Sequence, residues 1–297
     1  MKPIPECVPD IMNMVLDAAS RATSEPFIHR KVLARVMTAL ASDGDFGSDA
    51  NDLVQRAIET AYKTLGVRDP YEKEKARRNR AMRGLDKEIA AYLDGMPDRV
   101  AAAVMISWAA AQVDLDVLGR EEARATTFNR LRASPPHPDE RADLAEAVVK
   151  AERVWIVAGD AGEIVADRCL AAELRAIGKQ VTMVVASRPV LAMATPEDAE
   201  TAECRAVAEV IDPGAGMFGL SLDKATGAFR ERFAAADLVI AKGAAHFAAL
   251  REGGREFFSL MRADCPHEAA CWGVPPGSGV LAKWTPERTS GQASKKA

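Results

Sequence analysis

The second half of the chain alternates short, apolar, β-branched segments with helical ones, and this alternation limits the fold more than any other feature. The short segments are VWIVAG (154–159), VTMVVAS (181–187), AVAEVI (206–211), DLVIAKG (237–243) and GVLAKW (279–284). Helical patterns occupy residues 163–177, 196–204, 226–235 and 255–263. Strands that alternate with helices form parallel sheets covered on both faces. We therefore predict a Rossmann-like, mostly parallel three-layer α/β/α domain over residues 136–285.

The first half of the chain has a different pattern. Apolar residues recur at helical spacing, among many Ala, Glu, Arg and Leu residues, over 28–42, 50–65, 70–94, 97–118 and 139–150. Turn-forming segments such as SDGDFGSD and ASPPHPDE interrupt these patterns. We predict a helical N-terminal part, residues 1–135, that packs on the α/β domain. The composition of residues 286–297 is typical of a disordered tail.

Charge and cysteine usage exclude several classes of protein. The net charge is −4 and basic residues are spread along the chain, so we expect no nucleic-acid partner. No apolar stretch is long enough to span a bilayer, and the N-terminal residues indicate an amphipathic helix rather than a signal peptide. The five cysteines are an odd, scattered set, which is typical of reduced thiols. We expect a cytoplasmic protein without a membrane partner.

Open parallel sheets bind ligands beyond the carboxyl ends of their strands. Four loops follow predicted strands: Gly159–Glu163, Ser187–Met193, Asp212–Gly219 and Lys242–His246. We expect the functional site to be assembled from these loops, with a wall from the helical half.

Three side chains in these loops could carry chemistry, and each has a structural alternative. Asp160 could ligate a metal, or it could cap the following helix. Lys242 ends a buried strand and could bind phosphate, or it could extend to the edge of the sheet. His246 could be a metal ligand, an acid–base group or a packing residue.

Two further motifs favour structural roles. Gly214, Gly216 and Gly219 have the GxGxxG spacing, but LSLDKAT separates them from the next helix, so they predict a flexible loop rather than a dinucleotide site. Cys265, His267 and Cys271 lack the fourth ligand that zinc sites normally have, which indicates a helix with half-buried thiols.

Several segments, in order, resemble the damage-control phosphatase family with the acidic-residue-methyltransferase-like fold. LGVRDPYEKEKARRN is similar to the family pattern LGVxDPYxxxKxxxN and retains Asp69, Pro70, Tyr71, Lys75 and Asn79. The other similar segments are GDAGEIVAD (159–167) to DNAGEIVFD, PVLAMATPEDA (189–199) to PVLNDATxEDA, DLVIAKGAAHFA (237–248) to DLVIAKGQGNFE, and AAQVD, which ends at Asp114, to GNNFD.

The resemblance implies a hydrolase that uses a divalent metal (Co, Ni, Mn or Mg) on sugar phosphates or related damaged metabolites. It also implies metal ligands at the positions of Gly159, Asp160 and Met193, of which only Asp160 offers an oxygen. The family's Asn and Glu in the last motif are His246 and Ala248 here. We therefore predict a pseudoenzyme with weak or lost phosphatase activity, which binds a phosphorylated small molecule or a protein partner in the ancestral cleft.

The expected site lies between Asp114, the loop of Gly159–Glu163, Lys242 and His246, and the resemblance places phosphate contacts at Gly162, Glu163, Lys242 and Gly243. Two alternatives remain open. In one, Asp160 shares a rearranged metal site with Asp114 and His246, and the enzyme is active. In the other, the protein is a structural or scaffolding subunit.

Overall fold

A six-stranded sheet forms the centre of the protein, whose computed structural model describes residues 2–42, 49–112 and 135–288. The strand order is β3-β2-β1-β4-β5-β6, with β1 to β5 parallel and β6 antiparallel to β5. The strands are β1 (Arg153–Val157), β2 (Gln180–Val184), β3 (Glu209–Ile211), β4 (Leu238–Lys242), β5 (Phe257–Ala263) and β6 (Ser278–Trp284). This arrangement confirms the predicted Rossmann-like α/β class.

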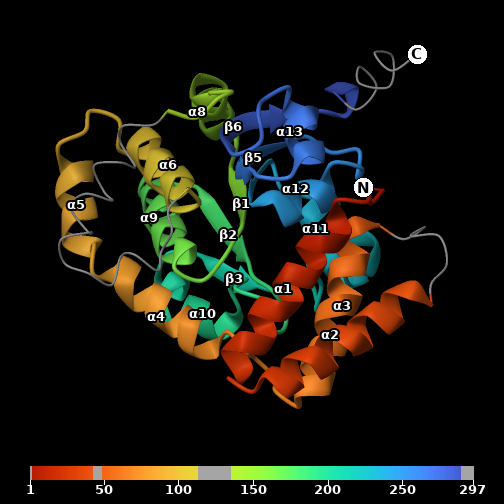
Figure 1. The fold of residues 1–297 in the computed structure, drawn as a ribbon. Coiled ribbons are helices and arrows are strands. Elements are labelled where there is room, and N and C mark those ends of the chain that lie inside the picture. The colour runs from red at the N-terminus through yellow and green to blue at the C-terminus, as the bar shows by residue number, and fades with distance from the viewer. Residues whose placement is uncertain (1, 43–48, 113–134, 289–297) are drawn as a thin grey trace.

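Both faces of the sheet are buried, which explains the continuous apolar runs of its strands. In β1, Val154 and Ile156 belong to the core on one face, while Trp155 and Val157 belong to the core on the other. Successive side chains of a strand point to opposite faces, so a strand covered on both faces needs apolar residues at every position. Figure 1 shows helices on both sides of the sheet.

The helices divide into three groups. On one face lie α4 (Glu72–Arg83), α5 (Asp86–Asp94), α6 (Arg99–Ala110), α8 (Arg141–Lys150), α9 (Glu163–Ala176) and α10 (Pro196–Thr201). On the other face lie α11 (Gly227–Ala234), α12 (Ala244–Leu250) and α13 (Pro266–Trp272). The third group, α1 (Cys7–Ala22), α2 (Pro26–Ala41) and α3 (Ala50–Leu65), surrounds an apolar cluster of its own (Figure 1).

The cluster between α1, α2 and α3 also includes two residues of the α/β domain. Val190 and Met193, from the loop after β2, pack into it and are 1% and 5% exposed. The described helices of the N-terminal half are thus divided between this cluster and one face of the sheet. The domain boundary at residue 135 stays a prediction.

One predicted helix is wrong. Residues 255–263 form β5, from Phe257 to Ala263, rather than a helix. The segment REFFSLMRA has buried residues on both faces, so it lacks the period of two that distinguishes a half-buried strand. The segment 70–94 is two helices, α4 and α5, which are separated at Gly84.

Some predictions fall outside the described residues: positions 113–118 of the segment 97–118, and positions 289–297 of the tail. Among the helices that are described, none combines the length and the apolar character that crossing a membrane requires.

Candidate functional site

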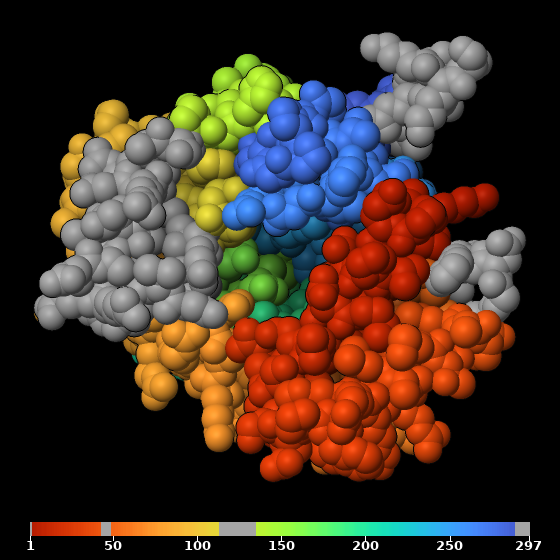
Figure 2. All heavy atoms as spheres, in the orientation of Figure 1, coloured from red at the N-terminus to blue at the C-terminus, as the bar shows by residue number. Residues whose placement is uncertain are grey.

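The four predicted loops meet at the centre of the sheet. The parallel strands β1 and β4 are neighbours, but the next strand lies on opposite sides of them: β2 lies beside β1, and β5 lies beside β4. Such a switch point opens a crevice at the carboxyl ends of the two strands. Asp160 pairs with Met193 in a short antiparallel bridge, and the N–H of Leu220 donates to His246 Nδ1 at 3.1 Å. Figure 2 shows the molecule hollowed between α1 (red), α6 (yellow) and the C-terminal segments (blue).

Lys242, at the end of β4, is fully buried in an ionic cluster rather than extended into the crevice. Its Nζ donates to Asp167 Oδ1 at 2.8 Å and to the carbonyl oxygen of Ser107 at 2.7 Å, and lies 3.4 Å from Glu163 Oε2. The hydroxyl of Ser107 also donates to Asp167 Oδ1, at 2.6 Å. The N–H groups of the Lys242 ammonium therefore point to acceptors inside the protein.

The ionic cluster shifts the pKa values of its members. Burial alone would lower the pKa of Lys242, but the negative charges of Asp167 and Glu163 outweigh burial and raise it. Burial raises the pKa of Glu163 to about 7, although the charge of Lys242 opposes this shift. Lys242 therefore carries its charge at neutral pH, while Glu163 takes up a proton at higher pH than an exposed glutamate does. The oxygens Glu163 Oε2 and Asp167 Oδ2 accept no hydrogen bond within the described part of the chain.

The three positions implied as metal ligands form no site for a hard cation. A Cβ at Gly159 would lie 2.8 Å from Glu163 Oε2 and 3.3 Å from the Cβ of Lys242, so Glu163 occupies the space of a side chain at 159. Met193 is buried against the helices α1 to α3. Only Asp160, whose side chain is 40% exposed, offers an oxygen. The described residues contain no group of three His, Cys, Asp or Glu side chains placed to hold a metal.

Asp160 has a cationic neighbour that sequence reasoning missed. Nη1 of Arg78, on α4, lies 3.7 Å from Asp160 Oδ2, and the Arg78 side chain is 18% exposed. Desolvation by the surrounding protein raises the pKa of the Asp160 carboxyl even though part of its side chain is exposed, whereas the charge of Arg78 is the largest influence that lowers this pKa. No pattern in the sequence points to Arg78, because its contact with Asp160 depends on the packing of α4 against the loop after β1.

His246 has no free ring nitrogen. Its Nδ1 accepts from the N–H of Leu220, so Nε2 carries the proton and donates to the carbonyl oxygen of Ala158 at 3.0 Å. Burial lowers the pKa of His246 to about 4, which keeps the ring neutral. His246 therefore joins the loops after β1, β3 and β4, and this arrangement favours the packing interpretation over a metal ligand.

The two glycines expected to contact phosphate also have partners within the protein. The N–H of Gly162 donates to Asn79 Oδ1 at 2.6 Å, and the N–H of Gly243 donates to the carbonyl oxygen of Leu260 at 3.0 Å. A phosphate would have to displace these acceptors to bind either amide. The phosphate contacts expected at Gly162, Glu163, Lys242 and Gly243 stay predictions.

The segment LGVRDPYEKEKARRN, the most specific family match, braces the site. Asn79 accepts from Gly162 and donates through Nδ2 to Asp198 Oδ1 at 2.8 Å. Lys75 Nζ lies 2.7 Å from Asp69 Oδ2 and 3.3 Å from Asp198 Oδ2. These contacts tie α4 to the start of α9 and to the capped start of α10. The family pattern points to Asp69, Lys75 and Asn79, but the elements that they connect are visible only in the tertiary structure.

The rearranged metal site is not supported by the residues that are described. Asp114 lies outside them, so its distance from Asp160 stays open. Of its expected partners, His246 has both nitrogens engaged and Asp160 lies beside Arg78.

The fold and the position of the polar residues define a class: Rossmann-like α/β proteins whose crevice lies at the carboxyl ends of the two central strands. A family model for the damage-control phosphatase ARMT1-like domain matches residues 4–280. The chain belongs to this family. The match ends within β6, which runs from Ser278 to Trp284.

Relatives and a solved structure agree with this assignment. The chain is 27% identical to a damage-control phosphatase of Archaeoglobus fulgidus, over 94% of this chain and 98% of that protein. It is 27% identical to an uncharacterized protein of Methanocaldococcus jannaschii, over 94% of each. The crystal structure of a DUF89 family protein from Pyrococcus horikoshii superposes with a TM-score of 0.88 at 25% identity, covering 96% of this chain and 100% of that one.

Proposed function

We propose that this protein is a diverged member of its family that has lost metal-dependent hydrolysis and binds a phosphorylated small molecule in the crevice at the carboxyl ends of β1 and β4. One observation carries the proposal: the donor set at the three implied ligand positions. Gly159 has no side chain, Met193 has a buried thioether, and only Asp160 has a hard oxygen. Magnesium and manganese need several oxygen ligands, so this set does not fit them.

Loss of the metal removes hydrolysis more completely than it removes binding. In a metal-dependent phosphatase the ion polarises the ester and activates water, and a side-chain cation does not generate hydroxide in this way. Arg78, which donates through Nε to Glu74 Oε1 at 2.9 Å and lies 3.7 Å from Asp160, still brings a permanently charged guanidinium group to the crevice. Guanidinium groups recognise phosphate oxygens through charge-assisted hydrogen bonds. These two properties support binding of a phosphate ester without its turnover.

The hydrolysis part is tested by restoring the implied ligands. The native full-length chain is incubated with p-nitrophenyl phosphate and Co²⁺, Ni²⁺, Mn²⁺ or Mg²⁺, and we expect no release of nitrophenol above the metal-only background. The variant Gly159→Asp/Asp160→Asn/Met193→Asp should bind Co²⁺ about tenfold or more tightly than the native chain in calorimetry. Its melting temperature should rise with added Co²⁺, because a ligand that binds the folded state stabilises it.

A matched control separates the ligands from the substitutions themselves. Gly159→Ser/Asp160→Asn/Met193→Leu changes the same positions without adding carboxylates, and it should show no cobalt-dependent rise in melting temperature. Rapid metal-dependent hydrolysis by the native chain, abolished by Asp160→Ala, would contradict the proposal.

The binding part is tested with glucose 6-phosphate and inorganic phosphate as probes, in metal-free buffer. Arg78→Gln should weaken binding about tenfold, which corresponds to about 1.4 kcal/mol. Arg77→Gln, the same change on the adjacent residue of α4, should alter affinity by less than about threefold. If the native chain binds neither probe, or if the two variants behave alike, the crevice is not a phosphate site.

The structural-subunit alternative would be favoured by a large exposed apolar patch. The large apolar side chains that are exposed within the described ranges are spread over α1, α2, α8 and the end of α9: Leu16, Phe27, Met37, Val149 and Ile177. This distribution does not favour that alternative.

A further inference from the structure

A second cavity lies at the opposite edge of the sheet from the crevice, over the amino-terminal ends of β1, β2 and β3. Its volume is about 450 Å³, within the range of small-molecule sites. We call it the amino-edge groove. The lining residues that the argument uses are Arg153, Arg175, Lys179, Gln180, Thr182 and Arg232.

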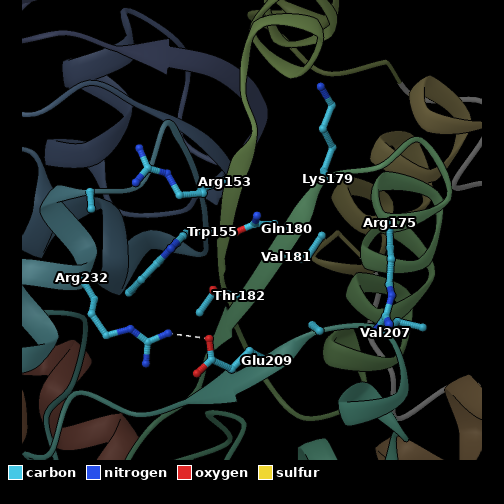
Figure 3. A pocket seen from close by; sticks show the side chains of 12 residues that line it. Arg153, Trp155, Arg175, Lys179, Gln180, Val181, Thr182, Val207, Glu209 and Arg232 are labelled. Carbon is cyan, nitrogen blue, oxygen red and sulfur yellow. Dashed lines mark hydrogen bonds and ion pairs between the residues drawn. The ribbon is translucent and has the colours of Figure 1, made fainter.

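The groove exists because α11 covers only part of its face of the sheet. Phe229 and Phe233 of α11 pack edge-on against Trp155 of β1, with ring centroids 5.6 and 5.4 Å away. The neighbouring positions of β2 on this face are polar, Gln180 and Thr182. Figure 3 shows these two side chains between Arg232 on one side of the groove and Arg175 on the other. The sequence thus places polar residues where the helix layer ends.

The walls of the groove carry an excess of positive charge. Arg153 pairs with Asp237 at 2.7 Å, and Arg232 pairs with Glu209 at 2.5 Å (Figure 3). Arg175 and Lys179 have no carboxylate partner among the described residues. Their nitrogens donate to backbone carbonyl oxygens, Arg175 to Ala206 and Lys179 to Val149 and Ala151. Four cations against two carboxylates leave two positive charges uncompensated.

The floor of the groove carries two hydrogen-bonding side chains. Thr182, with 8% of the residue exposed, and Gln180, which is exposed, both line the cavity from β2. A few polar groups that converge on a cavity are typical of small-molecule sites, where they orient the ligand.

We propose that the amino-edge groove binds a small polyanion, a molecule of up to about nucleotide size that carries several phosphate or carboxylate groups. Arg175 and Lys179 would supply charge, and Thr182 and Gln180 would supply hydrogen bonds from the floor. Charge-assisted hydrogen bonds to guanidinium and ammonium groups suit both kinds of anion. The groove lies at the edge of the sheet away from Asp160, so this site does not depend on the crevice.

The test measures binding of two probes, pyrophosphate and citrate, to the full-length chain by calorimetry in metal-free buffer at low salt. Arg175→Gln/Lys179→Gln should weaken binding of the preferred probe at least about tenfold. Thr182→Val keeps the shape of the side chain and should weaken it by a few-fold. Lys31→Gln/Arg35→Gln, on the exposed face of α2, makes the same change in net charge and should have no effect.

Hydrogen exchange locates the bound probe. Protection should appear over residues 179–182 and 207–209 in the native chain and in Arg78→Gln, which keeps this site distinct from the crevice. The proposal is overturned if the native chain binds neither probe, if Arg175→Gln/Lys179→Gln binds as tightly as the native chain, or if the α2 control loses as much affinity. Protection only around residues 158–163 would also overturn it.

Discussion

The buried ionic cluster of Lys242 makes a quantitative prediction about stability. Lys242 and Asp167 are both fully buried, and one oxygen of Asp167 already has no hydrogen bond within the described residues. Lys242→Met would leave the Asp167 carboxylate in the core with the hydroxyl of Ser107 as its one hydrogen-bond partner among the described residues. Breaking a buried pair from one side costs about 3–5 kcal/mol, against a total stability of about 5–15 kcal/mol.

The charge argument also predicts a rescue. In Lys242→Met/Asp167→Asn the buried carboxylate is gone, while the amide oxygen of Asn still accepts from Ser107. We expect the double variant to recover about 2 kcal/mol of the loss, because most of the cost of the single variant is the isolated charge. Urea unfolding at pH 7.5, followed by circular dichroism, measures both free energies.

A surface pair of the same type is the control. Lys283 lies 2.5 Å from Glu256, but the two side chains are 37% and 55% exposed. Lys283→Met should therefore cost less than about 1 kcal/mol. The reasoning is refuted if Lys242→Met costs no more than Lys283→Met, or if adding Asp167→Asn makes the Lys242 variant less stable still.

Two buried titrating groups predict opposite pH dependences. Glu163 has a pKa of about 7 in the folded protein and about 4.5 in the unfolded chain. Between these two values the folded state holds a proton that the unfolded state releases. The free energy of unfolding therefore falls by up to about 3 kcal/mol as the pH rises from 4.5 to 7. Glu163→Gln should lack this fall when unfolding free energies at pH 5 and pH 8 are compared, and an unchanged slope would disprove the shift. His246, with a pKa of about 4 when folded and 6.5 when unfolded, contributes stability that is lost as pH falls from 6.5 to 4. His246→Asn should be less stable than the native chain at pH 7 and should approach it as pH falls; a constant difference between the two proteins would contradict a buried neutral ring.

The sheet could be predicted because its signal is local. A parallel strand buried on both faces is apolar at most positions, and β1, β2 and β4 have this pattern with helices between them. The same property made residues 255–263 ambiguous: FFSLM has no period that separates a buried strand from a buried helix. Residues before and after it, including Gly253 and Gly254, were a better guide than the segment itself.

The loops of the site could be predicted from topology, but the contacts of their side chains could not. Strand order brings the residues after β1 and β4 together whatever their identity. Whether Lys242 faces the crevice or the core depends on Ser107 and Asp167, which lie on α6 and α9. Arg78 reaches Asp160 because α4 packs beside the start of α9, where Asn79 accepts from the N–H of Gly162. Such pairings join residues about 60 to 140 positions apart, where no periodic pattern operates.

The surroundings of the implied ligand positions constrain which side chains they can hold. An aspartate at Gly159 would place its Cβ 2.8 Å from Glu163 Oε2, so Glu163 would have to rotate and give up its contact with Lys242. An aspartate at Met193 would place a carboxylate in an apolar cluster, which is costly unless a metal neutralises it. Neither single substitution provides a ligand without a cost in stability, and only the two together supply the charge that would retain an ion. A metal site at these positions would therefore require several simultaneous substitutions.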